Sequence, residues 1–256
     1  MRPSALLGWV LGIGYAAMFL VLELIGKVPY EKLTDSAANV LHAVVIPLAV
    51  GAVVIAGVTT YLGWWTPAIR EDRPRRPWML VVPALLFVAV FAGIDYQQLG
   101  ALGGQYLFYL VLGGIGVGFC EEMAYRGLTL TAMRGSHPEW LSAVLASLLF
   151  GLLHGVNVIL GQGAGLTLYQ VCFAFALGLA FYVARRASGT LIVPMILHGL
   201  WDFGAFSYSG AATITGISKS TSLLHLLQTP VALLALLVSL AALPYLFKHA
   251  EPPQSK

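Results

Sequence analysis

Long apolar runs, separated by short polar segments, dominate this chain and limit what it can fold into. A membrane-spanning helix needs about 20 consecutive apolar residues, and runs of this length recur along most of the sequence. We expect spans near residues 5–26, 37–63, 78–94, 104–134, 138–160, 165–186, 190–208 and 222–247. The pattern therefore predicts an all-α, polytopic membrane protein with about eight transmembrane helices.

The composition supports the same fold class. Hydrophobic residues make up 59% of the chain and charged residues 10%, and the mean hydropathy is +0.83. Because a soluble domain carries roughly 25% charged residues, a chain with so little charge cannot cover a water-facing surface. The basic residues behind the net charge of +3 are scattered over short loops, which excludes a nucleic-acid-binding face. Cys120 and Cys172 lie in apolar runs, so no disulfide framework is expected.

We expect one membrane domain. Residues 1–77 would form two N-terminal transmembrane helices and a basic cytosolic loop, residues 78–247 the membrane core, and residues 248–256 a cytosolic tail. The first apolar run is longer than the apolar region of a typical signal peptide, and no small-residue cleavage site clearly follows it. We therefore interpret it as a retained helix.

The distribution of Lys and Arg predicts the orientation. Ten basic residues fall on one side of the expected spans: Arg2, Arg70, Arg73, Arg75, Arg76, Arg134, Arg185, Arg186, Lys248 and Lys256. Three fall on the other side: Lys27, Lys32 and Lys219. The positive-inside rule then predicts a multi-pass protein of the cell membrane with both termini in the cytosol. The loop from Arg70 to Arg76 is expected to lie on anionic lipid head groups.

Six ionisable residues lie at helical spacing inside these apolar runs: Glu121, Glu122, Arg126, His154, His198 and Asp202. Ionisable groups at membrane depth are costly, which makes them a functional-site hypothesis by default. At a rise of 1.5 Å per residue, Glu121 and His154 lie ~20–24 Å from the cytosolic helix ends. The same count places His198 and Asp202 at roughly 12–18 Å, so the four residues can converge near the middle of the bilayer.

The two adjacent glutamates cannot face the same way. Glu122 and Arg126 lie one turn apart on one helix face, whereas Glu121 points about 100° away. An adjacent guanidinium keeps a buried carboxylate ionised. We therefore assign Glu122 and Arg126 a structural and electrostatic role and Glu121 the chemical one. The remaining polar residues of the runs are interpreted as structural or surface residues: His42, His137, His225, His249, Glu23, Asp95 and Asn157.

The fourth expected span is rich in glycine. The glycines are Gly103, Gly104, Gly113, Gly114, Gly116 and Gly118. They would allow close helix packing or leave a lateral opening for a substrate helix, and we favour close packing.

The order of the polar motifs resembles a known family. Glu121-Glu122-x-x-x-Arg126, Phe150-x-x-x-His154 and His198-x-x-x-Asp202 follow one another on successive expected helices. This order is similar to that of the CPBP family, also called Abi or CAAX-protease-and-bacteriocin-processing proteins, which includes the type II CAAX prenyl endopeptidases. The resemblance covers roughly Met79 to Phe247, so residues 78–247 would be its catalytic core.

The resemblance implies an intramembrane endopeptidase. Glu121 would activate water with help from His154, while His198 and the residue at Asp202 would bind the oxyanion. The prenyl endopeptidases typically carry Asn at the last position, and an ionised aspartate cannot donate a hydrogen bond. Asp202 would therefore be protonated, orient His198 or bind a metal. The implied substrate is a membrane-associated or lipid-modified protein or peptide cleaved near its C-terminus, and membrane lipids are the other expected partner.

Two mechanisms and two other classes of protein remain open from the sequence. In the first mechanism Glu121 is the base and no metal takes part. In the second, Glu121, His154, His198 and Asp202 supply ligands for Zn²⁺. The absence of His-Glu-x-x-His favours the first mechanism. The alternatives to an enzyme are a non-catalytic membrane scaffold or bacteriocin-immunity protein, and a proton-coupled transporter, which the lack of an internal repeat disfavours.

Overall fold

The apolar runs form helices long enough for a bilayer in the computed structural model, which describes residues 1–73, 75–216 and 223–248. The N-terminal half contains α1 (Ala5–Gly26), η1 (Tyr30–Lys32), α2 (Ala37–Val40), η2 (Leu41–Val45), α3 (Ile46–Leu62), α4 (Trp65–Ile69), η3 (Pro77–Leu80), α5 (Val81–Gly93), α6 (Tyr96–Leu99) and α7 (Gly104–Glu122). The C-terminal half contains η4 (Met123–Thr129), α8 (Leu130–Met133), α9 (Glu139–Leu153), η5 (His154–Val158), α10 (Ala164–Ser188), α11 (Ile192–Thr215), α12 (Leu223–Leu226) and α13 (Gln228–Lys248). The all-α membrane fold is confirmed, since the described residues form no strand.

Six of the eight expected spans are long apolar helices in the described part of the chain. Within the described residues, six helices are long and apolar enough to cross a membrane: Ala5–Gly26, Ala37–Leu62, Gly104–Met133, Glu139–Val158, Ala164–Ser188 and Gln228–Lys248. The expected span at 78–94 is a shorter apolar helix, Pro77–Gly93, and the one at 190–208 is the 24-residue α11. The count of eight therefore stays a prediction.

Local signals explain several helix ends. Ser4 precedes α1, and its hydroxyl accepts a hydrogen bond from the amide of Leu7 at 3.3 Å, which caps the helix. Gly189 ends α10 in the left-handed region, at a φ of 79°, where glycine avoids the clash that a side chain would make. The next helix, α11, can therefore return antiparallel to α10 after a very short connection.

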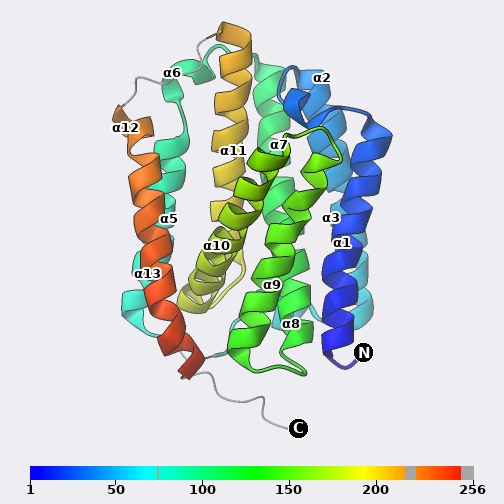
Figure 1. Cartoon of the computed structure of the whole chain (residues 1–256), viewed down its shortest axis with the longest axis vertical. Helices are drawn as coiled ribbons and strands as arrows, with labels where there is room; N and C mark the ends of the chain where they lie inside the picture. Colours follow the sequence, from blue (N-terminus) through cyan, green and yellow to red (C-terminus); the bar gives the residue numbers. More distant parts are fainter. Residues whose placement is uncertain (74, 217–222, 249–256) are drawn as a thin grey trace.

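Helices that are distant in the chain pack side by side (Figure 1). α11 lies against α7, α10 against α9, and α13 against α5, while α1 packs on η4, α8 and α3. The first helix begins and the last helix ends at the same end of the bundle, here called the terminal end (Figure 1). This agrees with an even number of crossings, but which end faces the cytosol stays a prediction. Residues 249–256, which include His249 and all of the expected tail except Lys248, lie outside the described residues, as does Lys219.

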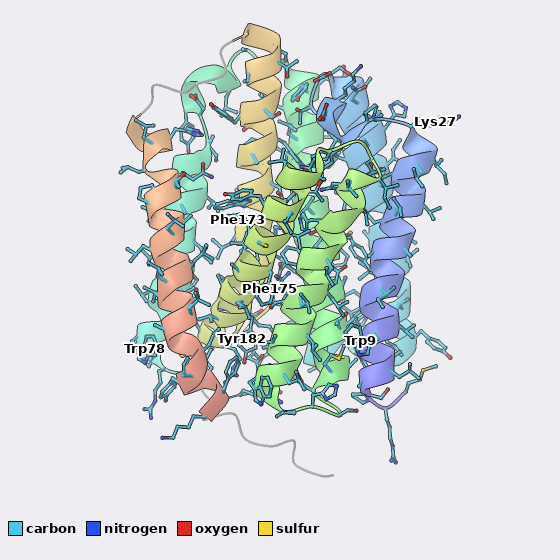
Figure 2. All side chains as sticks on the ribbon, viewed as in Figure 1. Trp9, Lys27, Trp78, Phe173, Phe175 and Tyr182 are labelled. Carbon is cyan, nitrogen blue, oxygen red and sulfur yellow. The ribbon has the colours of Figure 1, made fainter. Side chains whose placement is uncertain are left out.

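Tryptophan side chains mark a level near the terminal end. Trp9 and Trp78 lie at this level, and Lys27 lies at the opposite end (Figure 2). Trp78 and Trp140 are 48% and 49% exposed at the starts of their helical segments. Tryptophan is enriched where a membrane protein crosses from hydrocarbon to head groups. The level is therefore consistent with one membrane interface.

The terminal end also contains a buried ion-pair cluster that the sequence analysis did not predict. The terminal cluster consists of Glu71, Arg73, Arg134, Glu139, Arg185 and Arg186. Arg134 Nη2 bridges the two glutamates of the cluster, since it lies 2.6 Å from Glu139 and 2.9 Å from Glu71. Arg185 and Arg186, which the orientation argument counts at the end of the expected span 165–186, lie near the end of α10 and have no exposed surface. Buried glutamates hold both arginines within the fold.

Close contact between α7 and α11 depends on glycine. A Cβ atom added to Gly114 would lie 2.7 Å from the carbonyl oxygen of Gly199, and one added to Gly118 would collide with the carbonyl of Met195. Backbone atoms cannot move away as a flexible side chain could. These glycines therefore act in close packing, which brings the glutamates of α7 next to the histidine of α11.

Candidate functional site

Glu122 is the centre of a buried polar cluster between α7 and α11. Its Oε1 accepts a hydrogen bond from Arg126 Nη1 at 2.9 Å and lies 2.8 Å from His198 Nδ1. The Glu122 side chain has no exposed surface, and those of Arg126 and His198 are nearly as buried. A carboxylate this deep needs such partners, because an unpaired buried charge is strongly unfavourable. Glu122 is thus neutralised from two helices.

Phe150 packs at the centre of the site. The guanidinium carbon of Arg126 lies 3.9 Å from the centre of its ring, the geometry of a cation–π contact. The rings of His154 and His198 meet the same ring nearly perpendicularly, at centroid distances of 5.2 and 5.4 Å. The phenylalanine of the second motif therefore fixes the positions of three polar side chains without carrying any chemistry itself.

Glu121 faces a different space from Glu122. It lines a cavity of about 100 Å³ that extends from the polar cluster toward the end of the bundle opposite the termini. The cavity is lined by Phe19, Glu23, Tyr30, Leu33, Ala43, Val44, Leu48, Val117, Glu121, Leu153, His154, Val156, Asn157, Leu160, Gln170, Asp202 and Phe206. Glu122, Arg126 and His198 are absent from this lining and lie behind it. The two adjacent glutamates thus occupy distinct environments, as helical geometry requires.

His198 connects the two environments. Its Nδ1 is beside Glu122, while its Nε2 lies 3.9 Å from Glu121 Oε2 and 3.3 Å from Asp202 Oδ2. Carboxylates only accept hydrogen bonds, and an imidazole protonated on both nitrogens donates from both. A doubly protonated ring therefore satisfies both sides of this contact. Asp202, with a side chain 22% exposed, is the more accessible of these partners.

His154 has its tautomer set by the backbone. Its Nδ1 lies 3.1 Å from the carbonyl oxygen of Phe150, one turn earlier. Because a carbonyl can only accept, Nδ1 carries the proton, and Nε2 of the neutral ring keeps a free lone pair. His154 also lines the cavity. It can therefore accept a hydrogen bond from a water molecule or substrate there.

Four polar residues that the sequence analysis left out of the site also line this cavity: Glu23, Tyr30, Asn157 and Gln170. Gln170 joins two of them, since its Nε2 donates to Tyr30 Oη at 3.0 Å and its Oε1 accepts from Asn157 Nδ2 at 3.0 Å. Glu23 and Asn157 had been interpreted as structural residues near span ends. The sequence signal that could have pointed to Glu23 is its charge inside the first apolar run. No spacing rule connects that run to the helices that carry the motifs.

The other described polar residues that the sequence analysis set aside are not among the residues that line this cavity. His42 and His225 each contact a backbone carbonyl through Nδ1, and Asp95 is buried elsewhere. His137 lies in the connection before α9. His249 falls outside the described residues.

The arrangement does not fit a zinc site. Among the described residues, no group of three or more His, Cys, Asp or Glu side chains is arranged to hold a metal ion. The four predicted ligands, Glu121, His154, His198 and Asp202, therefore do not form a metal centre in this conformation. Cys120 and Cys172 are both free, and the Cys120 thiol is buried against the carbonyl of Leu48 at 3.3 Å.

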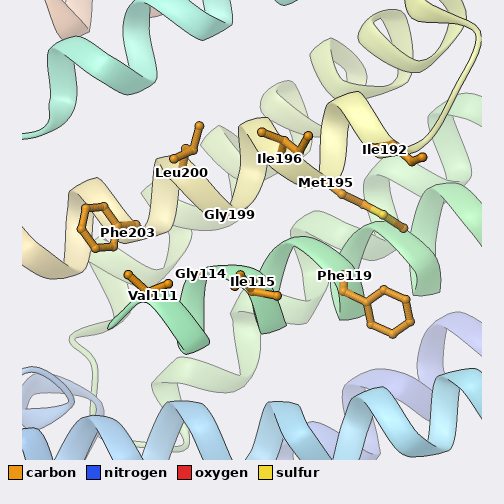
Figure 3. A pocket seen from close by; sticks show the side chains of 10 residues that line it. All are labelled: Val111, Gly114, Ile115, Phe119, Ile192, Met195, Ile196, Gly199, Leu200 and Phe203. Carbon is orange, nitrogen blue, oxygen red and sulfur yellow. The ribbon is translucent and has the colours of Figure 1, made fainter. Parts of the chain in front are cut away.

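A second, larger cavity of about 450 Å³ lies between α7 and α11 and is wholly apolar (Figure 3). It is lined by Val111, Gly114, Ile115, Phe119, Ile192, Met195, Ile196, Gly199, Leu200 and Phe203. Several of these side chains are about half exposed, which suits contact with lipid. The groove carries no titratable group, so the chemistry belongs to the smaller cavity at Glu121.

These features define a class: a polytopic α-helical membrane protein with a buried glutamate, histidine and arginine cluster beside a small polar cavity. Residues 103–204 match the family model described as type II CAAX prenyl endopeptidase Rce1-like. This match covers less than half of the chain but contains all six predicted site residues, and it confirms the resemblance to the CPBP family of CAAX-type proteases. No curated protein matches the chain, and no solved structure does.

Proposed function

We propose that this protein is an intramembrane endopeptidase that cleaves a peptide bond near the C-terminus of a membrane-associated or lipid-modified protein or peptide. The family match supports a CAAX-type protease in general. The observation that carries the finer proposal is the Glu121 carboxylate, which is 7% exposed in the cavity wall and has no hydrogen-bond partner for Oε2 in the structure. A carboxylate that is close to partners yet incompletely paired is suited to accept a proton.

In the proposed reaction, Glu121 takes a proton from a water molecule whose oxygen attacks the scissile carbonyl carbon. The lone pair on His154 Nε2 helps to hold this water in the cavity. As the C–N bond breaks, the proton passes from Glu121 to the leaving amine. Water thus supplies hydroxyl to the new carboxylate and hydrogen to the new amine.

The negative charge that develops on the carbonyl oxygen needs a donor. His198 can supply Nε2–H, because its other nitrogen is held by Glu122. An ionised Asp202 cannot donate, and its Oδ2, 3.3 Å from the same His198 Nε2, supports an orienting role in which Asp202 shares this N–H with the oxyanion. Arg126 and Glu122 act indirectly, because they hold His198 and Phe150 in place.

The test compares the C-termini of membrane proteins in cells that carry the wild type, Glu121→Gln, Glu31→Gln or no copy of the gene. Glu31 is an exposed glutamate of η1 outside the cavity, so its variant controls for expression and for loss of a charge. We expect the same termini to remain unprocessed in the Glu121→Gln and null cells, and to be processed with Glu31→Gln. The readout is mass spectrometry of terminal peptides, with the amount of each variant measured in parallel.

The outcome also distinguishes the protease from a scaffold. Substituting an isosteric amide removes the base but keeps the shape of the side chain, so a scaffold or immunity protein should tolerate it. Processing by a well-expressed Glu121→Gln protein would refute the assignment of Glu121. Equal function of wild type and variant, with a defect only in the null, would favour the scaffold.

A further inference from the structure

Glu23 is a buried carboxylate without a partner. It lies in the last turn of α1, is 3% exposed, and neither of its two oxygens has a hydrogen-bond partner in the structure. α1 lies outside the segment that matches the protease family, so the motif chemistry assigns Glu23 no role. A side chain that served only the fold would be expected to have its polar atoms paired.

Glu23 is one of the residues that line the cavity at Glu121. The lining of this cavity includes three carboxylates, those of Glu23, Glu121 and Asp202, and one histidine, His154. Among the described residues that line it, there is no lysine or arginine. The nearby guanidinium of Arg126 is held by Glu122 and Phe150 behind the cavity wall. The cavity is therefore lined by acidic groups, and the Arg126 guanidinium does not line it.

Lys27 does not neutralise Glu23. Lys27 follows Glu23 by one helical turn, but its backbone adopts the left-handed conformation at the end of α1, with a φ of 56°. Lys27 is also exposed. No ion pair joins these two side chains in the structure. In a continuing helix, residues i and i+4 share one face and could form an ion pair. Here the change of backbone direction at Lys27 keeps its side chain from pairing with Glu23.

We propose that Glu23 forms a subsite that binds a cationic side chain, the amine of lysine or the guanidinium of arginine, on the substrate peptide. A cation bound in this acidic cavity beside Glu23 would offset the cost of burying an unpaired carboxylate. Charge-assisted hydrogen bonds of this kind are short and strong. The substrate class follows from the proposed peptidase function, on which this inference rests. It adds that a basic residue close to the cleaved bond is preferred.

The test measures binding without cleavage. The full chain in lipid nanodiscs is unfolded thermally, followed by tryptophan fluorescence, with rising concentrations of Nα-acetyl-lysine methylamide or its uncharged norleucine analogue. A ligand that binds only the folded protein raises the unfolding midpoint in proportion to its affinity. We expect the lysine probe to raise the midpoint of the wild type and of Glu31→Gln, and the norleucine probe to leave both unchanged.

Glu23→Gln separates a binding role from a structural one. Loss of a charged hydrogen bond should weaken apparent binding of the lysine probe about tenfold or more. Without ligand, Glu23→Gln should be at least as stable as the wild type, because it removes an unpaired buried carboxyl group and no contact. No selective shift with the lysine probe, or a shift that persists in Glu23→Gln, would overturn the inference.

Separate experiments test the proposed protease function and the proposed cation subsite. The Glu121→Gln protein should still bind the lysine probe, because binding needs no catalytic base. A selective shift in a protein that cleaves nothing would keep the cation subsite and reject the protease. Where cleavage occurs, a synthetic peptide mixture read by mass spectrometry should show Lys or Arg at a fixed distance from the cut in the wild type. Glu23→Gln should lose that preference while still cutting neutral peptides.

Discussion

His198 Nδ1 lies 2.8 Å from Glu122 Oε1, and this contact joins α7 to α11 in the interior of the bundle. The same glutamate oxygen accepts from Arg126 at 2.9 Å, so one carboxylate neutralises charges from its own helix and from another. With Glu122 committed to these partners, Glu121 is left to face the cavity. The different roles of the two adjacent glutamates therefore depend on the contact between Glu122 and His198.

Glu122→Gln should destabilise the protein, whereas Glu121→Gln should not. The first change leaves the buried guanidinium of Arg126 without its carboxylate, and breaking a buried pair costs about 3–5 kcal/mol. The second removes a carboxylate that lines a cavity. Thermal unfolding of the purified variants checks the difference. Equal midpoints for the two variants would contradict the assignment of Glu122 as the structural partner.

Asp202→Asn should keep most of the activity, and Asp202→Ala should lose it. The amide oxygen of asparagine can still accept from His198 Nε2, which lies 3.3 Å from the native carboxylate, but alanine cannot. Loss of such an orienting partner typically costs about 10–100-fold. Cleavage rates on one substrate, with folding checked for each variant, measure the effect. If alanine and asparagine behave alike, Asp202 does not orient His198.

Gly118→Ala should separate α7 from α11. The added methyl group would collide with the backbone carbonyl of Met195, and the contact between Glu122 and His198 would lengthen. We expect a destabilisation of about 1–3 kcal/mol, as for other overpacked sites, together with lost cleavage. Gly104→Ala is the matched control, because nothing lies within 4 Å of its added Cβ. Similar effects of both changes would rule out close packing as the cause.

Acid should weaken the terminal cluster through Glu71. Burial alone would raise the pKa of the Glu71 carboxyl, but Arg134 and Arg185 lower that pKa below its ordinary value. The unfolded chain has a glutamate pKa of about 4.3. Because the folded pKa is lower, the contribution of Glu71 to stability is complete above that pH and is lost as the pH falls toward the folded pKa.

The acid effect can be isolated by comparing variants. Below about pH 4.3 the unfolding midpoint of the wild type should fall more steeply than that of Glu71→Gln, which has no carboxyl to protonate. Glu71→Gln should be less stable than the wild type at neutral pH, because it leaves arginines unpaired. Asp72→Asn removes the adjacent exposed carboxyl and should keep the wild-type slope. A Glu71→Gln profile as steep as that of the wild type would exclude Glu71 as the cause.

Sequence patterns predict relationships between residues that are close in the chain, but not contacts between distant segments. Helix periodicity is local, so it correctly separated Glu121 from Glu122 within one turn. It could not show that Glu23 lines the cavity, because that requires α1 to pack beside η4 and α9. It also could not show that Arg185, at the end of an expected span, is buried, since that burial depends on a glutamate from another segment.

The sequence by itself determined the membrane class, the helical fold and the order of the three motifs, because hydrophobic run length and residue spacing are properties of the chain alone. Only the tertiary structure decided which polar groups meet. Glycine contacts set the distance between α7 and α11, and this places His198 against Glu122. Packing of α1 adds Glu23 to the cavity at Glu121. Contacts between distant segments depend on how whole helix surfaces fit together, which no local pattern encodes.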